Sequence, residues 1–151
     1  MRLAALFLAL CWVGCAHVVA ADDQRLAVIV HPERIDALDL GALRTIYLRQ
    51  RQFWRDGNPI VPLNQPAASA IREQFSRQVL GGGSEQLSDF WNRQYFQGVL
   101  PPATLSSDSA VRLYVAADRN AIGYIHEDAA DATVRVVLRL EASTPIADVP
   151  H

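Results

Sequence analysis

Ser69 is the polar residue of this sequence that is best placed to bind an anion. It stands before a run in which Ile71, Phe75 and Val79 recur every four positions, and this spacing predicts a helix that starts just after the serine. At a helix start the hydroxyl lies beside backbone N–H groups that lack partners inside the helix, here those of Ala70 and Ile71, and beside the positive end of the helix dipole. A small oxyanion can dock there, and the same residue type also serves as a simple N-cap.

Four arginines around Phe53 and Trp54 offer a second place for an anion or for a partner protein. They are Arg44, Arg49, Arg51 and Arg55. Guanidinium groups pair with phosphate and stack on aromatic rings. The alternative is a solvated helix end, where arginine complements the negative end of the helix dipole. The sequence leaves both interpretations open.

His31 and His126 each follow an apolar run, so they can face the strand ends where α/β proteins bind ligands. The sequence has no His-x-x-x-His spacing, no Gly-x-Ser-x-Gly elbow and no recognisable pairing of a nucleophile with a base, which are the signatures of metal sites and hydrolases. Gly81 to Gly83 separate two predicted helices and lack the lysine of a phosphate loop, which favours a helix connector. We therefore expect a binding protein and no enzyme, with no cofactor and no metal.

The elements that must position these groups alternate between strand and helix patterns. Leu26 to Val30 is an unbroken apolar run, which predicts a central strand buried on both faces, as in parallel sheets. Further strands are predicted at Ala121 to Ile125 and at Ile60 to Leu63, where Pro62 favours a sheet edge or the end of the strand. In a last strand the apolar residues are expected on one face and the arginines on the other; these are Val134, Val136, Leu138 and Leu140, against Arg135 and Arg139.

Four helices are predicted from apolar stripes and capping residues. The second of them stops at Gly81 and forms a hairpin with the third. Their caps or first residues are Asp39, Ser69, Ser84, and Ser106 or Ser107. Strands that alternate with helices in this way indicate an α/β fold.

The chain has 151 residues, which suits one domain behind an export segment. Residues 1–21 combine a positive start, an apolar run of about 14 residues and small residues before Asp22, and so predict a cleaved signal peptide and a periplasmic protein. A lipoprotein is the minor alternative. Cys11 and Cys15 both lie in this segment, so residues 22–151, the single mature domain, hold no thiol for catalysis, metal binding or disulfides. With 14 basic and 16 acidic residues in the chain, no nucleic-acid partner is expected.

Several landmarks, taken in order, resemble the second-lobe region of phosphate-type substrate-binding proteins of bacterial ABC transporters. The matching segments are Leu26 to Pro32 (a buried strand), Leu40 to Leu48 (a helix before an aromatic turn), Phe53 to Ile60 (a tryptophan followed by a turn and a strand), Ala67 to Leu80 (the helix whose N-terminus holds phosphate), Trp91 and Ala121 to Ile125. The resemblance covers about residues 25–140, nearly the whole mature chain.

The resemblance implies one periplasmic-binding-protein type II lobe, that is, an α/β fold with a mixed, mostly parallel sheet flanked by helices. It implies a small oxyanion as ligand, phosphate in the family, and a membrane transporter as partner. The implied ligand residues are Ser69, Ala70, Ile71, Asn64, Gln65 and Ser107.

The chain departs from the family pattern at the binding motif. Gln65 stands where the family has an arginine, and Ile71 stands where it has a hydroxyl residue. Without the guanidinium the site lacks a bidentate, charge-assisted clamp, which lowers the expected phosphate affinity. The chain also supplies about one lobe, whereas relatives close two lobes over their ligand. An alternative function is therefore a periplasmic adaptor that kept the fold, lost the ligand and contacts an envelope protein through the surface from Arg44 to Arg55.

Overall fold

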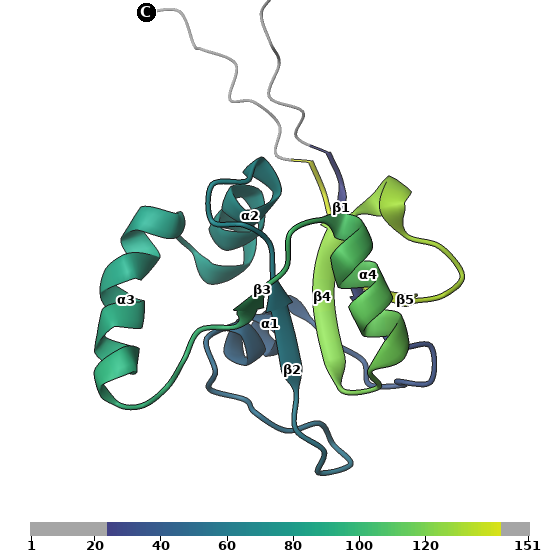
Figure 1. Ribbon diagram of the computed structural model, residues 1–151, viewed down its shortest axis with the longest axis horizontal. Helices are drawn as coiled ribbons and strands as arrows, with labels where there is room; N and C mark the ends of the chain where they lie inside the picture. The colour runs from purple at the N-terminus through teal and green to yellow at the C-terminus, as the bar shows by residue number, and fades with distance from the viewer. Residues whose placement is uncertain (1–23, 143–151) are drawn as a thin grey trace, which may run out of the picture.

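Strand β1 (Leu26–Val30) consists of five fully buried side chains, because helices cover both of its faces. Successive side chains of a strand point to opposite faces. Leu26, Val28 and Val30 accordingly pack in one apolar cluster, while Ala27 and Ile29 pack in a second. The computed structural model describes residues 24–142 and is a sheet between two helical layers (Figure 1).

The sheet has five strands in the order β3-β2-β4-β1-β5. The other strands are β2 (Val61–Asn64), β3 (Ala103–Thr104), β4 (Ala121–His126) and β5 (Arg135–Leu140). β2 pairs in parallel with β3 and β4, whereas β1 pairs antiparallel with both β4 and β5. The mixed sheet flanked by helices is confirmed. Its parallel share is smaller than expected, because an apolar run records how many faces of a strand are covered but not the direction of its neighbours.

Strand β5 does not keep its apolar residues on one face, as the alternation predicted. The pairing with β1 shifts register between Val28 and Ile29, and an extra residue in a strand reverses the side-chain alternation beyond it. Val136 therefore packs with the cluster that contains Ile29, while Leu138 and Leu140 pack with the opposite cluster. The expectation of one shared face for these residues is wrong for this reason.

One face of the sheet is covered by α1 (Leu40–Tyr47), α2 (Ala70–Phe75) and a π-helical turn η1 (Ser76–Leu80) that continues α2. Asp39 caps α1 as predicted, since its carboxylate accepts from the Ala42 amide at 2.7 Å. η1 ends at Gly81, whose φ of 79° is left-handed and favours glycine. Beneath these helices the rings of Phe75 and Tyr124 stack with centroids 3.8 Å apart.

Helix α4 (Asp108–Ala117) covers the other face, in front of β4 in Figure 1. Val111 and Val115 pack against the sheet there. Gly123 makes this close approach possible, because a Cβ at that position would lie 2.4 Å from Cγ1 of Val111.

Helix α3 (Ser84–Phe96) lies outside the short edge strand β3 (Figure 1). Leu87 and Phe90 pack against the core, while Tyr95 and Phe96 are exposed. A short 3-10 turn η2 (Glu127–Ala129) links β4 to the loop before β5. The predicted signal peptide and both cysteines lie outside the described residues. Within residues 24–142 no helix has the length and apolar character needed to cross a membrane.

Candidate functional site

The carboxyl end of β2 brings together four residues that we call the strand-end site: Asn64, Gln65, Ser69 and Arg72. Asn64 is the last residue of β2, and the chain then turns through Pro66 into α2. Asn64 and Gln65 are buried, whereas Ser69 and Arg72 are partly exposed. Three of the four were expected from the sequence.

Ser69 caps α2 as predicted, and this role occupies its hydroxyl. Its oxygen accepts from the Arg72 amide at 3.3 Å and its hydrogen is donated to the Pro66 carbonyl at 2.7 Å. A hydroxyl has a single hydrogen to donate, so an oxyanion would have to displace the Pro66 contact to gain that bond. The amides of Ala70 and Ile71 begin the helix and have no partner four residues earlier within it. The side chain of Ile71 points into the core and is 5% exposed.

Gln65 faces α4 and not the start of α2. Its Nε2 donates to the Asp108 carboxylate at 2.6 Å and to the Tyr124 carbonyl at 3.3 Å. Its backbone carbonyl points the other way and accepts from Arg72 at 2.8 Å. Gln65 therefore joins the two helix starts, with its side chain on one and its main chain on the other.

Asn64 links β2 to Tyr124 and to Arg72. With its amide oxygen turned toward Arg72, it donates to the Tyr124 hydroxyl at 2.8 Å and accepts from both terminal nitrogens of Arg72 at 3.2 and 3.3 Å. The Tyr124 hydroxyl also accepts from the Gln65 amide at 3.2 Å. Burial raises the pKa of Tyr124 above its ordinary value, so this hydroxyl stays neutral.

The start of α4, where Ser107 was expected to bind ligand, already holds a carboxylate of the chain itself. Ser107 caps the helix by accepting from the Ala110 amide at 3.2 Å. Asp108, in the first turn, accepts from Gln65 and lies 2.7 Å from Nδ1 of His126. Negative charge is favourable at a helix start, and here Asp108 supplies it. An exogenous anion bound at Ser107 would therefore meet the Asp108 carboxylate.

Arg72 is the residue that the sequence analysis missed. It lies in the first turn of α2, and long helical side chains point back toward the N-terminus. Its guanidinium therefore returns to the end of β2, where the contacts described above are all to neutral oxygens. In residues 24–142 no carboxylate lies within ion-pair distance of it. The sequence does contain a signal for Arg72: it stands three residues after the predicted cap Ser69, on the first helical turn, from which a long side chain can return to the end of the strand.

A hollow of about 410 Å³ opens beside Arg72, between α2 and α3. We call it the α2–α3 hollow. It is lined by Ala67, Arg72, Ser76, Glu85, Leu87, Ser88, Trp91, Asn92 and Pro101. The charged end of the strand-end site thus continues into a space with both apolar and hydrogen-bonding walls.

The arginines near Phe53 do not form one patch with the tryptophan. Trp54 is buried at 3% exposure, its Nε1 donates to the Asn120 carbonyl at 3.0 Å, and the guanidinium over its ring belongs to Arg34. Arg44 instead reaches the end of η1, near Gly81. Phe53 is 59% exposed. Arg51 donates to the Phe53 carbonyl at 3.4 Å, and Arg55 lines a hollow beside Arg34. The four predicted arginines therefore do not gather around the Trp54 ring.

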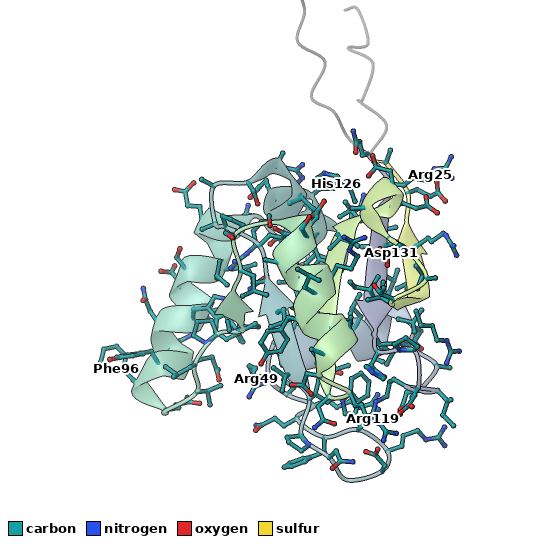
Figure 2. All side chains as sticks on the ribbon, turned by 45° about the vertical axis from the view of Figure 1, so that its right-hand side comes forward. Arg25, Arg49, Phe96, Arg119, His126 and Asp131 are labelled. Atoms are coloured by element: carbon teal, nitrogen blue, oxygen red, sulfur yellow. The ribbon has the colours of Figure 1, made fainter. Side chains whose placement is uncertain are left out.

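The opposite end of the sheet contains a group that we call the Arg34 cluster: Arg34, Asp36, Trp54, Asp56 and Asn120. Asn120 precedes β4, which runs parallel to β2, so this cluster and the strand-end site lie at opposite ends of the two strands. Figure 2 shows the same separation between Arg119, beside the cluster, and His126. A hollow of about 500 Å³ lies against the cluster. In the described part of the chain no group of three or more histidine or acidic side chains is arranged to hold a metal ion.

The fold is similar to part of several solved phosphate-type substrate-binding proteins. A phosphate ABC transporter substrate-binding protein from Clostridium perfringens, solved with bound phosphate, superposes with a TM-score of 0.61 at 22% identity, over 76% of this chain and 45% of its own. An ABC-type phosphate transport receptor from Vibrio cholerae gives 0.60 at 20% identity, over 76% and 46%. PstS from Borrelia burgdorferi gives 0.52 at 16%, over 69% and 41%.

The chain therefore spans less than half the length of these solved structures, which agrees with the expected resemblance to part of such a protein. No family model matches the sequence, and no curated protein matches it either. The likeness is one of fold.

Proposed function

We propose that this protein is an exported binding protein for a small oxyanion of the phosphate type, that it acts in the periplasm with an ABC transporter, and that it binds the anion at the strand-end site. The fold shared with phosphate-binding structures supports the ligand class. The observation that carries the proposal is Arg72, a partly buried guanidinium that contacts neutral oxygens and no carboxylate of the described residues. Such a group keeps its charge available to an anion.

In this proposal Arg72 takes the part of the arginine that the family has at the position of Gln65. The two places are compatible, because Arg72 donates to the main chain of Gln65 itself. The amides of Ala70 and Ile71 add donors from the helix start beside it. Ser69 shapes this turn through its cap, and Asn64 holds the guanidinium in place.

Phosphate-dependent thermal stabilisation of the purified chain tests the proposal. A ligand that binds only the folded state adds about 2.7 kcal/mol at a concentration 100 times its Kd, so we expect the melting temperature to rise with phosphate and not with chloride at equal ionic strength. Arg72→Gln should abolish the rise. Arg77→Gln is the matched control, since Arg77 lies on the same helical segment but pairs with Glu73 at 3.2 Å.

Two results would contradict the proposal. One is a melting temperature that millimolar phosphate leaves unchanged, and the other is an equal response of wild type and Arg72→Gln. In the first case capture of an envelope protein by the wild type, lost in a variant with Arg51→Glu and Arg55→Glu, would support the adaptor alternative.

A further inference from the structure

The strand-end site continues into a space much larger than an inorganic oxyanion needs. The α2–α3 hollow has a volume of about 410 Å³, and a water molecule takes about 30 Å³ of liquid. Sites for small organic ligands occupy about 300–1,000 Å³. The hollow therefore falls within the size range of an organic ligand site.

The walls of the hollow differ along its length. Arg72 contributes the positive charge, at the end of β2. Apolar surface comes from both sides, and it belongs to Ala67, Leu87, Trp91 and Pro101. Trp91 is only partly buried, so its indole has surface left for a ligand. A charged group beside a large aromatic face suits a molecule with an oxyanion at one end and an apolar part at the other.

Ser76, which also lines the hollow, is a second and independent sign of a ligand. It is 1% exposed, and its hydroxyl oxygen has no hydrogen-bond partner in the described structure. Buried polar groups are nearly always paired. Ser76 also begins the π-helical turn η1, a form that is rare and frequently found at functional sites. Ser76 and Arg72 are four residues apart, so they share one face of the helical segment.

Glu85, which is exposed, lines the same hollow. Its carboxylate repels an anion that lies close to it. The same carboxylate is not within ion-pair distance of Arg72, so it does not neutralise the guanidinium. The oxyanion therefore belongs at the Arg72 end of the hollow, and the part of the ligand near Glu85 must be uncharged or able to donate a hydrogen bond.

We propose that the ligand is an organic oxyanion, such as a phosphate monoester, whose charged group pairs with Arg72 and whose apolar substituent lies against Trp91 in the α2–α3 hollow. This inference rests on the proposed function and specifies its substrate class.

Titration calorimetry with two probes, inorganic phosphate and phenyl phosphate, tests the inference. We expect wild type to bind phenyl phosphate about tenfold more tightly than inorganic phosphate, because the phenyl ring gains one aromatic contact with the Trp91 indole. Trp91→Ala should remove this preference, so that the two probes bind this variant with about equal affinity. Phe96→Ala is the matched control, because Phe96 lies on α3, is 87% exposed and projects away from the body of the protein (Figure 2).

An NMR measurement keeps the test independent of the stability of Trp91→Ala. The indole N–H resonance of Trp91, assigned with Trp91→Phe, should shift with phenyl phosphate and stay in place with inorganic phosphate. Equal affinities for the two probes, with no indole shift, would overturn the organic-ligand inference alone. Binding of neither probe would overturn the proposed function as well.

Discussion

Arg34 and Arg72 show two uses of the same side chain at opposite ends of the sheet. Arg34 is 7% exposed, and its guanidinium lies 2.8 Å from Asp56, 3.5 Å from Asp36 and 4.7 Å from the centre of the Trp54 ring. Its Nε and one terminal nitrogen also donate to the Arg119 carbonyl. Arg72 is more exposed and meets only neutral oxygens. Arg34 therefore links three loops through its ion pairs and hydrogen bonds. Arg72 lies beside a hollow, and no carboxylate of the described residues neutralises its positive charge.

The comparison separates structural arginines from candidate ligand arginines by their acceptors. Carboxylates neutralise Arg34, and each of them would be left without a cation if Arg34 were removed. Carbonyl oxygens orient Arg72 without neutralising it. Counting arginines in the sequence, as in the surface around Phe53, cannot make this distinction.

Loss of Arg34 should have the largest effect on stability. We expect Arg34→Gln to lower the free energy of unfolding by about 3 kcal/mol, since it removes the cation of the buried Arg34–Asp36 pair and leaves the Asp36 carboxylate buried without a cation. Urea denaturation followed by circular dichroism measures this. Arg119→Gln is the control, because its side chain is 68% exposed beside Glu33, and it should cost about 0.5 kcal/mol or less. Similar losses in the two variants would show that the Arg34 cluster does not stabilise the fold.

Loss of Arg72 should cost less stability than loss of Arg34. Arg72→Gln gives up hydrogen bonds to neutral oxygens, so we expect a decrease of about 1 kcal/mol in the same denaturation experiment without added anion. A decrease as large as that of Arg34→Gln would remove the contrast between the two arginines and class Arg72 as structural.

The smallest expected effect is a difference in acid stability between wild type and Asp56→Asn, a variant that removes the Asp56 carboxylate of the Arg34 cluster. Hydrogen bonds from Asn58, and then from Arg34, lower the pKa of Asp56 from 3.8 to about 2. A carboxyl group with a lowered folded pKa adds stability above its unfolded pKa, and this is lost as the pH falls toward the folded value. Between about pH 4 and pH 2, wild type should therefore lose more stability than Asp56→Asn.

Thermal melts across this range give the comparison, with Asp89→Asn on α3 as control because Asp89 is also exposed. If the melting temperatures of Asp56→Asn and Asp89→Asn depend on pH in the same way, the hydrogen bonds to Asp56 do not contribute to the stability of the fold.

Local features were the ones that the sequence predicted well. The helix caps at Asp39 and Ser69 depend on residues within three positions, and both are confirmed. The same holds for the helix end at Gly81. Each of these needs only the chain beside it, so a single sequence contains the required information.

Features that depend on distant segments were missed or incomplete. The bulge in β5 depends on its pairing with β1, and the orientation of Arg72 depends on the carbonyl of Gln65. Gln65 was expected to face the ligand, but its side chain bonds to Asp108, 43 residues later. No periodicity or short motif encodes these contacts, because they arise only when the sheet has assembled.

The two outer strands of the sheet have a consequence for how other chains can associate with it. β3 is two residues long, and β5 has a register shift and places Arg135 and Arg139 at its exposed positions. Short edges, bulges and charged edge side chains all oppose the addition of a foreign strand. A partner protein would therefore bind through helices or side chains and not by adding a strand to the sheet. The same features oppose the edge-to-edge aggregation of sheets that leads to fibrils.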